Sequence, residues 1–202
     1  HTQERINALL VEHVKAGKRV CRLKGGDGFV FGRGGEELDA LDAHGLPYQV
    51  VPGVTAATAC AAYAGIPLTD RAHSHGVVLT TAYPADPERE PDWHTLTRSG
   101  HTLAFYMGAK RLAHVAEKLM AAGLPAATPF AVVERGATPA QRVLSGRLDE
   151  VDALTDVSAP AMLFVGRAAA AAGAHRWYQP ERFATAGAGV QPLSESLALG
   201  NA

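Results

Sequence analysis

The sequence has few cysteines. Cys21 and Cys60 are the only two among 202 residues. Two thiols so far apart provide neither a disulfide framework nor the ligand spacing of a zinc finger. One falls in a predicted strand and the other in a predicted helix of small residues, so we interpret both as packed thiols rather than nucleophiles. A chain without a disulfide framework fits a reducing compartment, and we predict a cytoplasmic protein.

The sequence also lacks an excess of charge and long apolar runs. Its 19 basic and 20 acidic residues leave a formal net charge of -1. No block of basic residues provides the electrostatic footprint of a nucleic-acid-binding protein. No apolar stretch approaches a membrane span, and no signal peptide is visible. Hydrophobic residues, at 47%, suffice for a buried core. We therefore predict a globular protein that binds neither nucleic acid nor membrane.

What is present is an alternation of strand, loop and helix patterns, which predicts an α/β fold with two domains. Predicted helices cover 2–17, 36–43, 55–64, 110–121 and 148–154. Predicted strands cover 20–23, 48–51, 77–81, 103–107, 130–134 and 161–165, and we expect those of the first domain to be largely parallel. The domains are predicted at 1–75 and 76–180, and a flexible Gly/Ala/Ser-rich tail is predicted at 181–202. Within the second domain, a loop is predicted at 84–91.

The start of the chain is unusual. The first residue is His1 rather than methionine, and a helical pattern capped by Thr2 follows at once. We expect that a further segment precedes His1 in the intact protein.

The sharpest local signal is the run Gly25-Gly26-Asp27, which directly follows a predicted strand. Ligands of open α/β sheets bind beyond the carboxyl ends of the strands, and glycines let the backbone approach them closely. Taken alone, the run is most simply a tight turn. It matches neither the dinucleotide fingerprint G-x-G-x-x-G nor a phosphate-binding loop.

A longer comparison is more specific. Residues 22–37, RLKGGDGFVFGRGGEE, resemble the signature of uroporphyrinogen-III C-methyltransferases, which are tetrapyrrole methylases. The blocks at 51–57, 64–69, 105–108, 134–136 and 141–142 are similar to later family blocks and occur in family order. The resemblance implies methylation of uroporphyrinogen III to precorrin-2, for siroheme or cobalamin, with S-adenosylmethionine as donor and S-adenosylhomocysteine as product. It also implies two domains with mixed sheets, an active site in the cleft between them, and a homodimer.

The resemblance assigns site residues position by position. Those implied for the methyl donor are Gly25, Gly26, Asp27, Val30, Thr55, Ala56, Met107 and Gly136. Those implied for the tetrapyrrole are Arg33, Glu36, Arg71, Tyr83 and Met107. Arginine suits this substrate because its planar, permanently charged fork binds carboxylates in pairs. Each residue also has a plainer interpretation, as a surface arginine, a helix-start acid or a core methionine.

The chain departs from the family pattern at several positions. Gly28 replaces a proline, Asp70 a histidine, and Ala82-Tyr83 a Gly-His pair. The family's first strand and Gly-x-Gly-Pro-Gly-Asp loop, with the acid and lysine that handle protons, have no counterpart among the 202 residues, so no catalytic residue is assigned. These departures leave open a shifted substrate or reduced activity.

Two other hypotheses therefore stand beside the leading one. The chain could bind S-adenosylmethionine without catalysis, or methylate a related corrin intermediate or a protein side chain. A metal site is not predicted, because His73 and His75 lack a third ligand at metal spacing and this kind of methyl transfer needs no metal.

Overall fold

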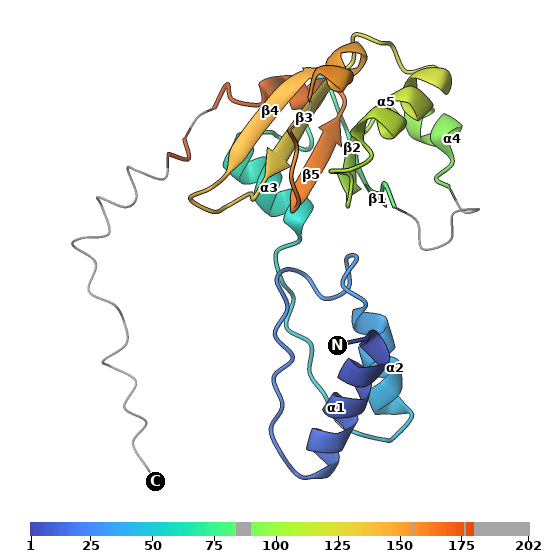
Figure 1. Ribbon diagram of the computed structural model, residues 1–202, viewed down its shortest axis with the longest axis vertical. Coiled ribbons are helices and arrows are strands. Elements are labelled where there is room, and N and C mark those ends of the chain that lie inside the picture. Colours follow the sequence, from blue (N-terminus) through green and yellow to red (C-terminus); the bar gives the residue numbers. More distant parts are fainter. Residues whose placement is uncertain (84–89, 155, 176, 180–202) are drawn as a thin grey trace, which may run out of the picture.

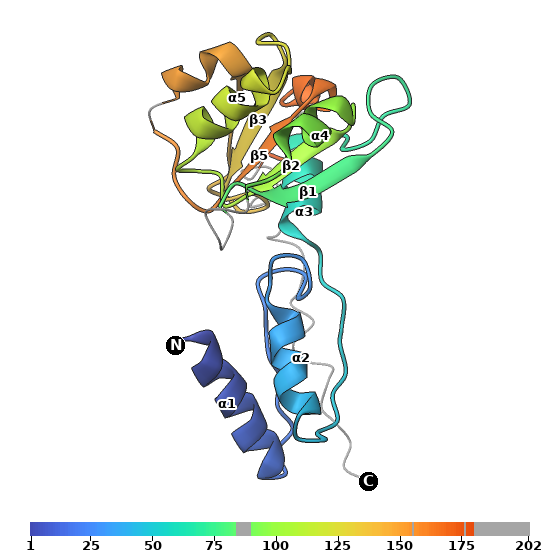
Figure 2. The ribbon, with the colours of Figure 1, turned by 90° about the vertical axis from the view of Figure 1, so that its right-hand side faces the viewer.

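The computed structural model describes residues 1–83, 90–154, 156–175 and 177–179, and these form two lobes (Figures 1 and 2). We call residues 1–55 the N-terminal lobe and the described residues from 56 to 179 the sheet lobe. The predicted tail at 181–202 and residues 84–89 of the predicted loop lie outside the described residues. Within the described residues, no helix has the length and apolar character needed to cross a membrane.

The N-terminal lobe contains two helices that lie against each other. Helix α1 (Gln3–Lys15) begins at Thr2, whose hydroxyl accepts the Arg5 N–H at 3.3 Å. Helix α2 (Gly34–Asp42) packs on it, with Leu10 and Leu41 as the buried apolar side chains of the two helices. Both helices confirm the sequence prediction. Helix α1 has apolar residues at helical spacing and a capping residue at its start, whereas the start of α2 at Arg33 has no capping side chain.

The predicted strands at 20–23 and 48–51 were wrong. Neither segment is a β-strand, although both run alongside the helices of the N-terminal lobe (Figure 1). A strand needs a hydrogen-bonded neighbour, and within the described residues no ladder includes either segment. Their apolar side chains are correspondingly exposed, and Leu23 and Val51 are 82% and 86% exposed. The expectation of largely parallel strands in this first domain falls with them.

The sheet lobe contains a five-stranded sheet in the order β1-β2-β5-β3-β4. The strands are β1 (Val77–Thr81), β2 (Thr102–Tyr106), β3 (Pro129–Glu134), β4 (Arg142–Arg147) and β5 (Ala161–Val165). Strands β1 and β2 are parallel, and the other three pairings are antiparallel. The sheet is therefore mixed, which confirms the predicted α/β fold with mixed sheets.

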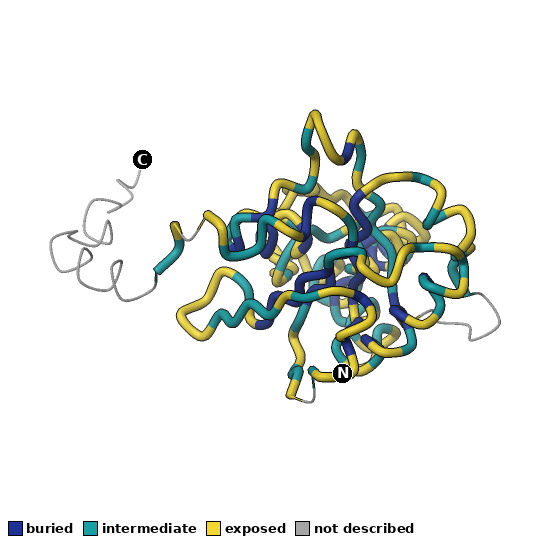
Figure 3. Tube along the Cα trace, turned by 90° about the horizontal axis from the view of Figure 1, so that it is seen from above, coloured by how far each residue is buried: buried dark blue, intermediate teal, exposed yellow. Residues whose placement is uncertain are grey.

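Helices cover both faces of this sheet. One face carries α4 (Trp93–Arg98), α5 (Leu112–Ala121) and the short helix η1 (Leu148–Ala153), over a core that includes Phe105 and Phe130. The other face carries α3 (Ala56–Ala64) and η2 (Arg167–Ala171), over a core that includes Phe164. Adjacent side chains such as Phe164 and Val165 reach opposite cores because strand residues alternate between faces. Figure 3 shows the buried stretches in the middle of the trace, with exposed turns around them.

Helix α3 connects the two lobes. The sequence division at 75–76 assigns it to the first domain, yet the helix lies against the sheet of the second (Figure 1), and its buried side chains belong to the core on that face. Its small residues Ala57, Ala61 and Ala64 are buried there, which lets the helix lie close to the strands. The N-terminus of α3 and the carboxyl end of β2 thus meet at the end of the sheet that faces the N-terminal lobe.

Candidate functional site

A cavity of about 360 Å³ lies at this junction. Its wall combines the glycine-rich loop, the start of α3 and the last residue of β2. The lining residues are Arg22, Leu23, Lys24, Gly25, Gly26, Asp27, Val30, Phe31, Gly32, Thr55, Ala56 and Tyr106. Polar backbone, charged groups and apolar side chains alternate around it, as in sites that hold a small polar molecule with an apolar part.

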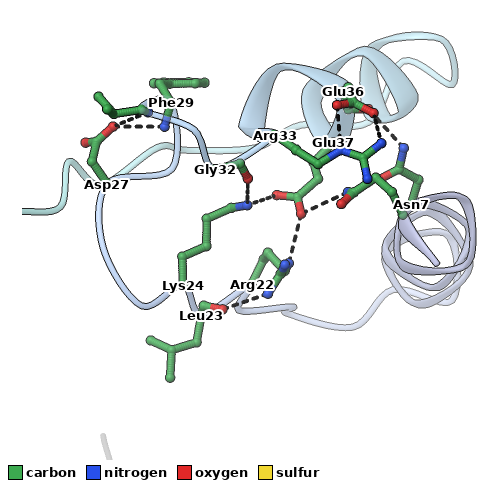
Figure 4. A network of polar contacts seen from close by, with 12 residues as sticks. Asn7, Arg22, Leu23, Lys24, Asp27, Phe29, Gly32, Arg33, Glu36 and Glu37 are labelled. Atoms are coloured by element: carbon green, nitrogen blue, oxygen red, sulfur yellow. Dashed lines mark hydrogen bonds and ion pairs between the residues drawn. The ribbon is translucent and has the colours of Figure 1, made fainter. Parts of the chain in front are cut away.

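Asp27 joins two backbone segments, the glycine-rich loop and the segment at Gly53. Its carboxylate accepts the Phe29 N–H at 2.8 Å and the Val30 N–H at 3.2 Å, closing the loop on itself (Figure 4). The other carboxylate oxygen accepts the Gly53 N–H at 3.1 Å. These N–H donors, Phe29 first, hold the pKa of Asp27 below its usual value. A Cβ at Gly53 would stand 2.5 Å from the Gly26 carbonyl oxygen, so this close approach requires glycine.

Glu37 holds the same loop in place through contacts with Lys24 and Arg22 (Figure 4). This side chain on α2 is 3% exposed and accepts hydrogen bonds from Lys24 Nζ at 2.9 Å and Arg22 Nε at 3.0 Å. Lys24 Nζ also donates to the Gly32 carbonyl at 2.5 Å, across the loop. Burial raises the pKa of the Glu37 carboxyl, but the hydrogen bonds from its neighbours outweigh burial and lower it. The buried carboxylate is thus fully partnered and fixes the loop on α2.

Gly25 leaves room inside the cavity. A Cβ built at this position would meet no heavy atom within 4 Å, although Gly25 is part of the wall. We expect a side chain there to extend into the open space beside this part of the wall. The glycine therefore keeps a backbone surface open to a ligand, which a tight turn alone would not require.

Tyr106 forms the part of the wall that the sheet provides. Its hydroxyl accepts the Ala57 N–H at 3.1 Å and is hydrogen-bonded to the Thr55 hydroxyl. Its ring lies 4.5 Å from the ring of Phe31 in the glycine-rich loop, between centroids. Tyr106 was not among the predicted site residues, although the family block at 105–108 contains it, because the resemblance implies a role only for its neighbour Met107.

The structure brings most of the predicted donor residues together. Gly25, Gly26, Asp27, Val30, Thr55 and Ala56 all line the cavity. Met107 and Gly136 are not among the lining residues: Met107 is 55% exposed, and Gly136 packs directly against Cys60 of α3. Burial raises the pKa of the Cys60 thiol, consistent with a packed side chain. The donor-binding roles of all eight residues stay predictions.

The predicted substrate residues are more scattered. Arg33 donates two hydrogen bonds to Glu36, of 2.7 and 2.6 Å, at the start of α2 (Figure 4). Arg71 is exposed in the turn before β1, and Tyr83 is exposed just after β1. Among the described residues, Arg33 and Glu36 are the only two of this set joined by a hydrogen bond or ion pair.

The positions that depart from the family pattern also have described surroundings. One carboxylate oxygen of Asp70 accepts the Ala72 N–H at 2.9 Å, and this hydrogen bond closes the turn that contains Arg71. The ring of Tyr83 lies 5.7 Å from the Arg111 guanidinium, a cation–π arrangement. Gly28 accepts the Gly34 N–H at 2.9 Å through its carbonyl. Among the described residues, no cluster of three or more metal-binding side chains occurs.

Comparison with known proteins matches most of the chain to a family. Residues 1–152 match the tetrapyrrole (corrin/porphyrin) methylases. The chain belongs to this family. The methylase is 49% identical over 183 residues to a siroheme synthase of Pseudomonas paraeruginosa, covering 89% of this chain and 39% of that protein. A siroheme synthase of Xylella fastidiosa is 48% identical over 179 residues, covering 87% and 38%. The methylase chain therefore spans less than half the length of these relatives.

Solved structures agree with the sequence match. The methylase is similar to a uroporphyrin-III C-methyltransferase of Thermus thermophilus, solved in complex with S-adenosylhomocysteine, with a TM-score of 0.73 and 40% identity. That match covers 82% of this chain and 74% of the Thermus chain. A cobalt precorrin-4 methyltransferase of cobalamin biosynthesis matches with a TM-score of 0.75 and 26% identity, covering 84% and 72%.

Proposed function

We propose that this methylase transfers methyl groups from S-adenosylmethionine to uroporphyrinogen III, giving precorrin-2. The observation that carries the proposal is that six residues predicted for the donor line one cavity. The similarity to the Thermus enzyme, solved with S-adenosylhomocysteine, supports the same donor here. As the resemblance implies, we further propose a cytoplasmic homodimer whose product leads to siroheme or cobalamin.

The residues present fit such a donor. The cavity volume of about 360 Å³ lies in the range of small-molecule sites. The open space at Gly25 is a cradle that any larger residue would fill. The backbone of Gly25, Gly26 and Asp27 would hold the donor on one side, and Thr55 and Ala56 on the other. The apolar walls at Val30 and Phe31 suit a flat aromatic group such as a nucleoside base.

The chain's contribution to the reaction is placement. The donor supplies a methyl group on a positively charged sulfur, which is already activated for transfer to a carbon nucleophile. An in-line displacement of this kind depends on orientation and on exclusion of water. Asp27 and Glu37 serve that end by fixing the loop in one shape, because each carboxylate is held by several hydrogen bonds. We assign no acid or base to the described residues.

The substrate is a carboxylate-rich tetrapyrrole, and Arg33 is its best-placed anchor. The Arg33 side chain is 53% exposed and lies in the sequence run that continues from the cavity loop. Glu36 currently occupies its guanidinium. A substrate carboxylate would therefore compete with Glu36, and the pair would orient the arginine until substrate arrives.

Two measurements test this function. Titration calorimetry with S-adenosylhomocysteine should show one site per chain. Incubation of the purified protein with S-adenosylmethionine and uroporphyrinogen III should produce the absorbance of precorrin-2 or its oxidised form. Donor binding without a methylated product would reduce the function to donor binding, and absence of both would contradict the proposal.

A further inference from the structure

One side chain of the sheet lobe connects both halves of the cavity wall. Among the lining residues, Tyr106 and Ala56 come from the sheet lobe, and Tyr106 alone comes from the sheet itself. It is the last residue of β2 and is 8% exposed. Its position is therefore fixed by strand pairing and by the core packed against the sheet, not by the loops that it contacts.

The Tyr106 hydroxyl takes the place of a helix cap. The first N–H groups of an α-helix have no partner within the helix. Thr55 occupies the cap position of α3, yet its side chain makes no capping hydrogen bond. The Tyr106 hydroxyl instead accepts the Ala57 N–H and is hydrogen-bonded to the Thr55 hydroxyl. Because Ala57 is fully buried, this N–H would otherwise lack a partner in the described structure.

The Tyr106 ring supports the opposite wall. Phe31, which belongs to the glycine-rich loop, packs against this ring at 4.5 Å between centroids. Phe31 has a φ of 51°, in the left-handed region that a non-glycine residue adopts only when its surroundings hold it. One tyrosine thus contacts the loop at Phe31 and the start of α3 at Thr55 and Ala57.

We propose that Tyr106 is a positioning residue that sets the separation of the two walls gripping the methyl donor. It acts through Phe31 on one side and through Thr55 and Ala57 on the other. This inference rests on the proposed function, because it concerns the donor cavity. A purely structural role would be felt as stability, whereas a positioning role is felt as affinity for the donor.

The test removes only the hydroxyl. Tyr106→Phe keeps the ring against Phe31 and deletes both hydrogen bonds. Tyr63→Phe is the matched control, because Tyr63 lies on α3, the helix that the Tyr106 hydroxyl contacts, but outside the cavity lining. Calorimetry with S-adenosylhomocysteine should show about tenfold weaker binding for Tyr106→Phe, the effect of one or two lost hydrogen bonds. Tyr63→Phe should stay within about twofold of the wild type.

A double-mutant cycle identifies the path. Thr55→Val removes the same hydrogen bond from its other end. If the hydroxyl acts through Thr55, the combined variant should bind the donor product no more than about twofold weaker than Tyr106→Phe alone. In turnover assays the KM for the donor should rise for Tyr106→Phe while kcat stays within about twofold, since the groups that react are untouched.

The outcomes separate the two proposals. If the wild-type protein fails to bind S-adenosylhomocysteine, the proposed function is overturned and this inference with it. If the wild type binds but Tyr106→Phe binds equally well, the positioning role alone is overturned. Should Tyr106→Phe fail to fold, Phe31→Leu provides the second test, because Phe31 is 46% exposed and its truncation is tolerable. Unchanged binding in Phe31→Leu and Thr55→Val would overturn the role as well.

Discussion

The two lobes hold their shape by different means. The sheet lobe has five paired strands and a core on each face, and its phenylalanines at 105, 130 and 164 are almost completely buried. The N-terminal lobe has two helices, a few buried apolar side chains and a network of ion pairs around Glu37. Loss of apolar packing should therefore disturb the sheet lobe most, whereas the N-terminal lobe contributes most of the cavity wall. Apolar packing fixes the platform, and directional polar contacts shape the loop that faces the ligand.

The largest expected effect tests the difference in packing. Phe164→Ala should lower the free energy of unfolding by about 4 kcal/mol, because the side chain is fully buried against the sheet. Leu41→Ala in the N-terminal lobe should cost only about 2 kcal/mol, because its surroundings form a shallow layer between two helices. Denaturant unfolding of both variants measures the contrast, and equal losses would break it.

The next effect compares two buried carboxylates, one in each lobe. Glu134 is fully buried in β3 and pairs with Arg142, which lies opposite it on β4. Glu134→Gln should lower the free energy of unfolding by about 3 kcal/mol, because it leaves a charged partner in a partly buried position. Glu37→Gln leaves Lys24 and Arg22 without their carboxylate, so it should likewise cost about 3 kcal/mol. It should in addition weaken binding of S-adenosylhomocysteine, which Glu134→Gln should leave unchanged.

The dependence of stability on pH provides an independent check on the Glu134–Arg142 ion pair. Hydrogen bonds from Arg142, against an opposing effect of burial, lower the pKa of Glu134 from 4.5 to about 2. A carboxyl with a depressed pKa stabilises the fold above its unfolded pKa, and this contribution is lost as the pH falls through the folded one. The wild type should therefore lose stability between pH 4.5 and 2, and Glu134→Gln should lose less over that window. Parallel curves for the two proteins would contradict the assignment.

A third variant probes the cavity rather than the core. Gly25→Val should leave the unfolding midpoint nearly unchanged, because a Cβ at this position has no heavy atom within 4 Å, and should weaken S-adenosylhomocysteine binding about a hundredfold by filling the cavity. Gly35→Val is the control, since a Cβ there is also free of contacts and Gly35 does not line the cavity. Equal binding by both variants would show that the ligand does not use this space.

The smallest expected effect concerns the surface. Arg33 and Glu36 form an ion pair whose side chains are 53% and 50% exposed. Exposed pairs of this kind contribute little, so Arg33→Ala should change the free energy of unfolding by less than about 0.5 kcal/mol. Its effect should appear instead as a higher KM for the tetrapyrrole, measured with the donor saturating. A KM within error of the wild type would remove Arg33 from the substrate site.

The contrast between the lobes also explains how far sequence reasoning reached. Strands β1, β2, β3 and β5 and helices α1, α2, α3 and α5 were predicted because apolar periodicity and end signals are local. Segments 20–23 and 48–51 carry equally good strand patterns but no paired neighbour among the described residues, and no local pattern reports a neighbour. Helix α4 was missed because six residues are too few to show a period.

The site divides in the same way. The run Gly25-Gly26-Asp27 could be found because it is contiguous and carries the family signature. Tyr106 could not, because its partners Ala57 and Phe31 lie 49 and about 75 residues away and meet it only through the packing of α3 and β2. Its neighbour Met107 received the role because the family pattern names it.

The contact between Gly136 and Cys60 has a consequence for the distance over which the cavity can be affected. A Cβ at position 136 would stand 2.4 Å from the Cys60 sulfur and 3.1 Å from the Cys60 Cβ, so the Cys60 side chain, or α3 with it, would have to shift to make room. Because α3 is a single helix of nine residues, a shift at Cys60 would also move Ala56, the first residue of the helix. A methyl group added in the turn after β3 would then disturb ligand affinity without ever reaching the ligand.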